Sequence, residues 1–166
     1  ETPLHCATTT NATSNVTRLE AIDILLKAGA DPQAVGGDLG LTPWHFLVPT
    51  GSPDTVRHFI EIKCDPNLQL PTHKAREQIK PGMAKHAEEN IAATLAVHGE
   101  GLTPLMFGVW MGNWETCEVL LQNGADVNLQ TSTGRTAMDW LHESQVFSGP
   151  TYETLVKYSG GWKLEV

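Results

Sequence analysis

The feature that most constrains this chain is an internal repeat with a period of 33 residues. Thr42 and Asp65 are separated by 23 residues, and so are Thr103 and Asp126. A further ten residues lead from Asp126 to Thr136, where a related block begins. A period of this length indicates a stack of similar supersecondary units, because each unit can bury its apolar face only against its neighbours.

Each block opens with a Thr-Pro pair, or a remnant of one, that predicts the start of a short helix. A Thr side chain accepts hydrogen bonds from the free N–H groups of a first turn, and Pro fits there because it has no N–H to leave unpaired. Three blocks begin Thr2-Pro3-Leu4-His5, Thr42-Pro43-Trp44-His45 and Thr103-Pro104-Leu105-Met106, and Thr136-Ala137 is the remnant.

A second helix is predicted in each of the first three blocks. These segments start at Glu20, Asp54 and Glu115, and an acidic first residue suits the positive end of a helix dipole. In each segment the third, sixth and seventh residues are apolar, which is the spacing of one stripe along an α-helix. We expect these stripes to face one another in the core.

Each second helix is followed by a stop signal. Gly29 and Gly124 suit the left-handed backbone that commonly ends a helix. Lys63 stands at the same position in the second block, so we expect a strained or remodelled end there. The Asp that follows each stop can turn the backbone through its own side chain.

Paired short helices with a polar turn and a Thr-Pro-Leu-His pattern resemble the ankyrin repeat. The resemblance rests on the blocks at residues 2–5 and 42–45 and on Gly-Ala-Asp-Val-Asn at residues 124–128. It implies an all-α helical-repeat solenoid of about four repeats, at residues 1–35, 36–67, 101–130 and 131–166. It also implies that His5 and His45 hold the turns to the helices through hydrogen bonds.

Two segments contain more residues than the 33-residue repeat provides for. The first, residues 8–18, is polar, and we expect it to form a long mobile loop between the helices of the first repeat. The second is an insertion at residues 68–100, with an irregular loop and then a helix from about Met83 to Val97. That helix either packs beside the stack or covers a binding groove. A short helix is expected near the end of the chain, with Trp162 folded over it as a cap.

Composition argues against several classes of partner. The net charge of −8 comes without a basic stripe, so nucleic-acid binding is not expected. The sequence has no apolar run of 18 residues and no leader pattern. We therefore expect no membrane span and no signal peptide in it. Cys6, Cys64 and Cys117 are widely spaced and predict buried, reduced thiols in a cytoplasmic or nuclear protein.

The start of the chain predicts that it is a fragment of a longer ankyrin-containing protein. Glu1 lies inside a repeat, and a terminal repeat normally needs a polar outer face. Leu4, Cys6 and Ile22 would instead leave an apolar flank uncovered. We therefore expect further repeats upstream.

No motif predicts catalysis, a metal site or a cofactor. Phosphate-binding loops, dinucleotide fingerprints and nucleophile motifs are absent from the sequence. His73, His86 and His98 lack the i, i+4 spacing of a helical zinc pair. Cys117 takes the apolar slot of Ile22, so it is interpreted as a core residue. The sequence therefore predicts a non-enzymatic protein.

The resemblance places partner contacts on the turn tips and on the groove face of the first helices. We predict that another protein or peptide segment binds there, through residues just before each Thr-Pro block and at the end of each first helix. By register these residues are Asp38, Leu39, Leu41, Pro49, Thr50, Glu100, Leu102, Trp110, Met111, Ser132, Thr133, Arg135, Glu143 and Ser144.

Trp110 and Met111 are the predicted anchors, because a Trp-Met pair is costly to leave exposed to water. The alternative is that the inserted helix already covers them. Trp44, Trp114 and Trp140 occupy slots that are apolar in the other repeats and are interpreted as structural.

Two other functions remain compatible with the sequence. The chain could recruit substrates for an enzymatic domain elsewhere in a longer protein. Alternatively, a small-molecule site or an unusual enzyme could form where residues 68–100 close on Trp110, with His73, His86 or His98 as its polar groups.

Overall fold

The structure is a computed structural model that describes residues 2–9, 15–36, 40–71, 99–143 and 150–160. Within these ranges the regular structure consists of eight α-helices, together with one isolated bridge between Gly36 and Leu41. The all-α fold is therefore confirmed. The helices are α1 (Pro3–Thr9), α2 (Asn15–Lys27), α3 (Pro43–Thr50), α4 (Pro53–Glu61), α7 (Pro104–Met111), α8 (Trp114–Gln122), α9 (Ala137–Glu143) and α10 (Pro150–Tyr158).

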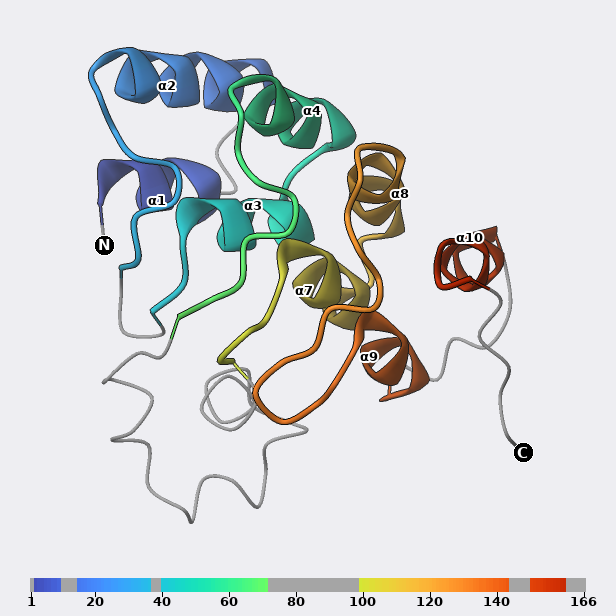
Figure 1. Ribbon diagram of the computed structural model, residues 1–166. Coiled ribbons are helices and arrows are strands. Elements are labelled where there is room, and N and C mark those ends of the chain that lie inside the picture. Colours follow the sequence, from blue (N-terminus) through green and yellow to red (C-terminus); the bar gives the residue numbers. More distant parts are fainter. Residues whose placement is uncertain (1, 10–14, 37–39, 72–98, 144–149, 161–166) are drawn as a thin grey trace.

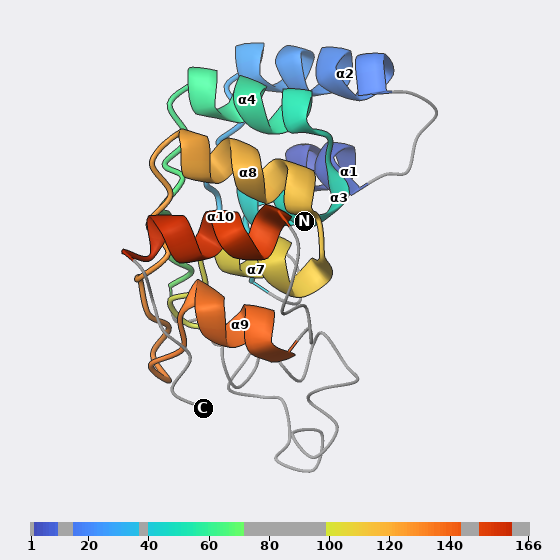
Figure 2. The ribbon, with the colours of Figure 1, turned by 90° about the vertical axis from the view of Figure 1, so that its right-hand side faces the viewer.

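The helices are arranged in two rows (Figure 1). In the inner row α1 packs on α3, α3 on α7, and α7 on α9. In the outer row α4 packs on α8 and α8 on α10, and α2 continues this row beyond α4 (Figure 2). Contacts between consecutive helices of a pair, such as α7 and α8, join the two rows. The described helices therefore form a stack of helix pairs, as the repeat predicts.

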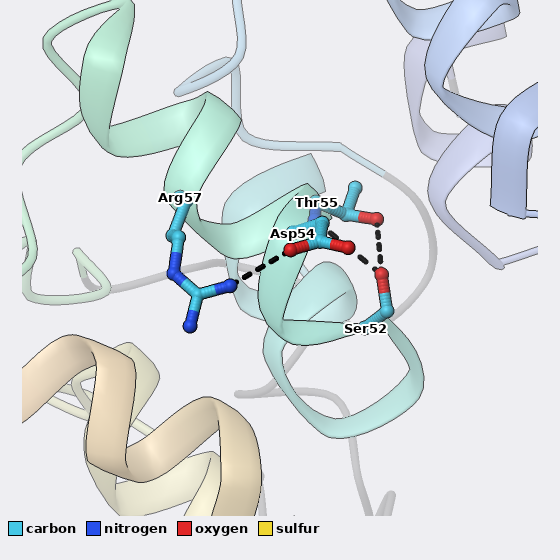
Figure 3. Close-up of polar contacts among 4 residues, drawn as sticks. All are labelled: Ser52, Asp54, Thr55 and Arg57. Atoms are coloured by element: carbon cyan, nitrogen blue, oxygen red, sulfur yellow. Dashed lines mark hydrogen bonds and ion pairs between the residues drawn. The ribbon is translucent and has the colours of Figure 1, made fainter.

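The Thr-Pro pairs begin helices as expected. The hydroxyl of Thr42 accepts a hydrogen bond from the backbone N–H of His45 at 3.2 Å, and Thr103 accepts from Met106 at the same distance. Ser52 performs the same role for α4 (Figure 3), where its hydroxyl accepts from the N–H of Thr55 at 3.4 Å. A proline follows each of these three caps, so the first turn has one fewer free N–H.

The apolar stripes of the second helices meet in one core. Its buried members from these helices include Ile22, Val56, Phe59, Cys117, Leu120 and Leu121. Trp44 of α3 stacks on Phe59 with a centroid separation of 5.4 Å, and its indole N–H donates to the carbonyl of Asp65 at 2.9 Å. Trp44 and Trp140 are both fully buried, which confirms their structural assignment.

The ends of the second helices share one geometry. In each, a backbone N–H bonds back to a carbonyl five residues earlier: Ala30 to Leu25, Cys64 to Phe59, and Ala125 to Leu120. The residue before each donor has a positive φ, +88° at Gly29, +89° at Gly124 and +71° at Lys63. The strain predicted at Lys63 is thus confirmed, since a side chain at this φ crowds its own backbone.

The turns after these helices also match one another. Asp31, Asp65 and Asp126 each accept a hydrogen bond on Oδ1 from the N–H two residues later, at 2.8 to 2.9 Å. The side chains therefore fold the turns locally, as predicted.

Buried histidine rings join neighbouring helix pairs. His5 links the first pair to the second, and His45 links the second pair to the third. The Nε2 atom of His5 lies 2.9 Å from the carbonyl oxygen of Leu41, and that of His45 lies 3.1 Å from the carbonyl oxygen of Leu102. The role that the resemblance implied for these rings is therefore confirmed. The Nδ1 atoms of both rings face the hydroxyls of their own Thr caps at 2.8 Å.

The insertion leaves and rejoins the stack at one point. The N–H of Leu70 donates to the carbonyl of Leu102 at 2.9 Å, and the N–H of Gly101 donates to the carbonyl of Leu70 at 2.8 Å. The helix expected at Met83–Val97 and the cap expected from Trp162 lie outside the described residues. The two hydrogen bonds show how α3, α4 and α7 form a continuous stack despite 27 intervening residues from 72 to 98.

Three expectations about the first repeat are wrong. The helices extend into the segment expected as a loop, because α1 ends at Thr9 and α2 begins at Asn15. Cys6, expected to be buried, is exposed, whereas Cys64 and Cys117 are buried as expected. Leu4 and Ile22 are fully buried and do not form an uncovered apolar flank. Both belong to the shared core that packs against the second repeat.

Candidate partner-binding surface

The predicted surface is formed by the ends of the inner helices and by the turn tips. Residues 49, 50, 110 and 111 lie at the ends of α3 and α7, which pack side by side. Glu100, Ser132 and Thr133 are exposed on the turns that precede α7 and α9. The backbone N–H of Ser132 donates to the carbonyl of Glu100 at 2.9 Å, so these two turn tips are joined.

Leu41 and Leu102 do not belong to this surface. Their side chains are 0% and 1% exposed, and both are part of the core. Their backbone carbonyls accept the hydrogen bonds from His5 and His45, which places these residues between adjacent helix pairs. The register correctly locates them before the Thr-Pro blocks, but it does not show which way their side chains point.

An aromatic cluster surrounds the predicted anchor Trp110. The ring centroid of Trp110 lies 5.6 Å from that of Phe107 and 5.2 Å from that of Trp140. The guanidinium carbon of Arg135 lies 4.5 Å from the centre of the Trp140 ring, which is within the range of a cation–π contact. These four residues, Phe107, Trp110, Arg135 and Trp140, are called the aromatic cluster below.

Within the cluster, Trp110 is partly buried and packs against the core. Phe107 and Trp140 are almost completely buried, at 3% and 0% exposure. Trp110 is therefore a structural residue at least in part, and its removal would loosen the packing of α7 against α9. Met111, by contrast, is 44% exposed and is the better candidate for a contact that a partner would make.

The repeat register could have indicated this cluster. Interpreting each tryptophan by itself does not, because the cluster becomes visible only when equivalent positions of the repeats are compared. Phe107 and Trp140 each follow the block-opening Thr by four residues, as do Cys6 and Phe46. These four positions therefore form one row along the inner helices. Exposure falls along the row, since Cys6 is exposed, Phe46 is half-buried, and Phe107 and Trp140 are buried.

The end of α3 is held in place from the next repeat. The side-chain amide of Asn113 donates to the carbonyls of Val48, Pro49 and Gly51 at 3.0 to 3.2 Å. The hydroxyl of Thr116 adds a bond to the Val48 carbonyl at 2.8 Å. These bonds satisfy carbonyls that lack a helical partner at a C-terminus.

The first repeat contributes to the same anchoring. The Thr50 hydroxyl donates to the carbonyl of Thr8 at 3.1 Å, and Arg18 donates through Nη1 to the carbonyl of Thr50 at 3.1 Å. The backbone around Pro49 and Thr50 is thus fixed relative to both neighbouring repeats. A partner would meet a surface that needs little ordering on binding.

The other predicted surface residues are less informative. Asp38, Leu39 and Ser144 lie outside the described residues, as do His73, His86 and His98, and the side chain of Glu143 is likewise not described. Arg135 is half-buried and points toward Trp140.

Across the ranges that the structure covers, no group of three or more His, Cys, Asp or Glu side chains is placed to hold a metal ion. None of the helices in these ranges is both long enough and apolar enough to cross a membrane. Burial raises the pKa of the Cys117 thiol to about 12, so this thiol stays protonated and unreactive near neutral pH.

The fold and the surface together define a helical-repeat solenoid of the kind that binds partners on a preformed face. The sequence profile described as "Ankyrin repeats (3 copies)" matches residues 11–131, which is most of the chain. The protein belongs to the ankyrin repeat family. This membership indicates a protein–protein interaction module.

A curated relative is also similar to this chain. The B-cell lymphoma 3 protein homolog of Mus musculus is 30% identical over 148 residues, an alignment that takes in 83% of this chain. The same alignment takes in 32% of that protein, so the chain spans about a third of the relative's length.

Proposed function

We propose that this protein is a non-enzymatic scaffold that binds a segment of another protein along the ends of α3 and α7 and the adjoining turn tips. The four helix pairs are assigned to repeats at residues 1–35, 36–67, 101–130 and 131–166, with the insertion at 68–100. The proposal includes a cytoplasmic or nuclear location.

The observation that carries the proposal is the exposure of Met111 next to helix ends that are held in place by their neighbours. An exposed Met at the end of a helix offers a flexible apolar side chain, which adapts to a partner's surface. The aromatic cluster fixes α7 below it, and the Asn113 amide fixes the neighbouring end of α3. A partner would therefore gain apolar contact with Met111 at little cost in ordering the scaffold.

The exposed polar residues on the turn tips form a polar rim. This rim would affect which partner binds more than how tightly it binds. Glu100, Ser132 and Thr133 are exposed on the joined turn tips, next to the inner helices. An exposed charge such as that of Glu100 mainly affects the association rate and the discrimination between partners, and the Ser132 and Thr133 hydroxyls offer hydrogen bonds. We propose that the partner presents an apolar side chain to Met111 and polar groups to this rim.

The test is site-specific photo-crosslinking in extracts of cells that express this protein. A crosslinker at position 111 is compared with one at position 24, because Ile24 is also an exposed apolar residue, at 66%, but lies on α2 in the outer row. We expect a defined partner to crosslink at position 111 and not at position 24. The same partner, once purified, should bind Met111→Ala at least tenfold more weakly than the wild type, about 1.4 kcal/mol.

Two outcomes contradict the proposal. One is equal crosslinking at both positions, which would indicate nonspecific contact. The other is unchanged affinity of the purified partner for Met111→Ala and for a Ser132→Lys/Thr133→Lys variant, with wild-type stability in both. Binding would then use another face of the stack.

A further inference from the structure

We propose that Arg135 binds a carboxylate of the partner segment, which therefore carries an Asp or Glu close to the apolar residue that contacts Met111. This inference rests on the proposed function and specifies the chemistry of its partner. Arg135 lies two residues before α9, and its guanidinium carbon is 4.5 Å from the centre of the Trp140 ring.

The contact with Trp140 fixes the position of the Arg135 head group. The Trp140 ring is 0% exposed, and its centroid lies 5.2 Å from that of Trp110, so the ring is held by the core. A guanidinium group that lies over a ring presents its face to the ring, while its N–H donors stay in the guanidinium plane, along the edge. A carboxylate that approaches this edge can accept two parallel hydrogen bonds, and little side-chain entropy is lost because the group is already positioned.

The acidic residue nearest to Arg135 in the sequence has another role. Oδ2 of Asp139 accepts hydrogen bonds from the backbone N–H and from the hydroxyl of Thr136, both at 2.7 Å. These bonds close the first turn of α9. A guanidinium group has five N–H donors and a paired carboxylate uses two of them, so Arg135 can bind an external carboxylate alongside its contacts within the chain.

The surroundings of Arg135 determine how strong this contact can be. The side chain is half-buried, so salt and water screen its charge less than that of a fully exposed residue. An exposed ion pair changes a binding constant by up to about fivefold, and charge-assisted hydrogen bonds to a partly buried group change it more. We therefore expect the carboxylate to strengthen binding by about five- to tenfold.

The net charge of the chain limits how acidic the partner segment can be. The chain carries a charge of −8, so its long-range field repels a strongly acidic segment. One carboxylate at Arg135 gains a local contact, whereas further acidic residues add to the repulsion. The expected segment is thus neutral or basic overall and has a single Asp or Glu at this place.

Arg135 and Met111 are close enough to contact one segment. Arg135 lies over Trp140, the Trp140 ring contacts Trp110, and Met111 is the residue that follows Trp110 in α7. Both ends of this series of contacts belong to the proposed partner-binding surface. A short segment can therefore place its apolar residue on Met111 and its carboxylate on Arg135.

Selection of random peptides displayed on phage tests this inference. The immobilised wild-type protein selects the peptides, and synthetic copies of the selected sequences are kept when Met111→Ala weakens their binding at least tenfold. These peptides contact the proposed surface. Among them we expect an Asp or Glu at a fixed spacing from an apolar residue.

A double-mutant cycle then shows whether the carboxylate contacts Arg135. Replacing the selected Asp or Glu of the peptide by Asn or Gln should weaken binding to the wild type about five- to tenfold, measured by calorimetry. The same peptide change should have little effect on binding to Arg135→Gln, because the contact is already lost. Arg135→Lys keeps the charge but cannot form two parallel hydrogen bonds, so the effect there should be smaller than in the wild type.

Arg57→Gln is the matched control, because it also removes a guanidinium group and the same charge. The Arg57 side chain is 52% exposed and is paired with Asp54 on α4, in the outer row (Figure 3). This variant should bind the selected peptides as the wild type does and should respond equally to the peptide change.

Three results would overturn the inference. Peptides that depend on Met111 but show no preference for Asp or Glu would do so and would leave the proposed function standing. A peptide change with the same effect on the wild type and on both Arg135 variants would show that the carboxylate is bound elsewhere. A selection without any Met111-dependent peptide would contradict the proposed function itself, and this inference with it.

Discussion

The Nε2 atom of His45 lies 3.1 Å from the carbonyl oxygen of Leu102, across 57 residues of sequence that include the insertion. The same oxygen accepts a hydrogen bond from the N–H of Leu70 at 2.9 Å. A carbonyl only accepts, so the Nε2 atom of His45 carries the proton in this contact. One buried ring therefore connects the second helix pair to the third at the place where the insertion departs.

His45→Ala is expected to lower the free energy of unfolding by roughly 2–4 kcal/mol. The substitution removes two buried hydrogen bonds and leaves a cavity beside the core. Urea denaturation followed by circular dichroism measures the change. His45→Met provides a comparison, because Met106 occupies the equivalent position in the third repeat. It fills the space without the bonds, and should cost less than the alanine. A cost below half a kcal/mol for both variants would contradict this role.

Much of the fold could be predicted because its signals are local. A capping hydroxyl, a proline in the first turn, an apolar stripe and a stop residue each act within a few positions, as at Thr103 and Gly124. Repetition at fixed spacing then identified the stack. The extension of α2 back to Asn15 was missed because its Thr- and Asn-rich sequence is typical of a loop.

The candidate surface was harder to predict because exposure depends on contacts between repeats. Phe46 and Phe107 share one register position, yet the first is half-buried and the second is buried. Leu41 and Leu102 lie just before the Thr-Pro blocks, where we predicted partner contacts, but their side chains enter the core. A period fixes where a residue lies along a repeat, whereas its burial depends on which side chains pack across from it.

Asn113→Ala is expected to destabilise the protein by about 1–2 kcal/mol. Its amide is the donor to three carbonyls at the end of α3, and of these the Val48 carbonyl also accepts from the Thr116 hydroxyl. Thermal unfolding of the variant measures the loss. Asn113→Asp is the informative control, because it keeps the shape but cannot donate, and a carboxylate would repel the same carbonyls. An aspartate variant as stable as the wild type would show that these hydrogen bonds contribute little.

Lys63→Gly is expected to stabilise the protein by about 0.5–1 kcal/mol. The backbone at Lys63 has a φ of +71°, a conformation that costs a residue with a side chain about 1 kcal/mol or more. Part of the gain is offset because glycine makes the unfolded chain more flexible. Denaturant unfolding with fixed m-values measures the difference. The reverse change at the equivalent position, Gly124→Ala, should destabilise. A Lys63→Gly variant that loses stability would mean that the lysine side chain makes a contribution larger than the backbone strain.

Alkaline pH should destabilise the fold through its two buried thiols. Burial raises the pKa of Cys117 from 9.0 to about 12, and burial, with a smaller effect from the Asp31 carboxylate, does the same for Cys64. Between these values the unfolded chain loses thiol protons that the folded chain keeps. The unfolded state therefore binds fewer protons, and stability falls as pH rises above 9, whereas below pH 9 the thiols contribute no pH dependence.

The loss of stability at alkaline pH can be calculated from the raised thiol pKa by proton linkage. The variant Cys117→Val measures the part that is due to one thiol. At pH 10 each buried thiol should cost about 1.4 kcal/mol relative to pH 8, so removing one should reduce the loss of stability by that amount. Unfolding free energies at pH 8.0 and pH 10.0 are compared for the wild type, Cys117→Val and Cys6→Ser. The last variant is the control, because it removes an exposed thiol instead of a buried one. If Cys117→Val lost as much stability as the wild type over this interval, the thiol would be ionising in the folded protein and could not lie sealed between α7 and α8.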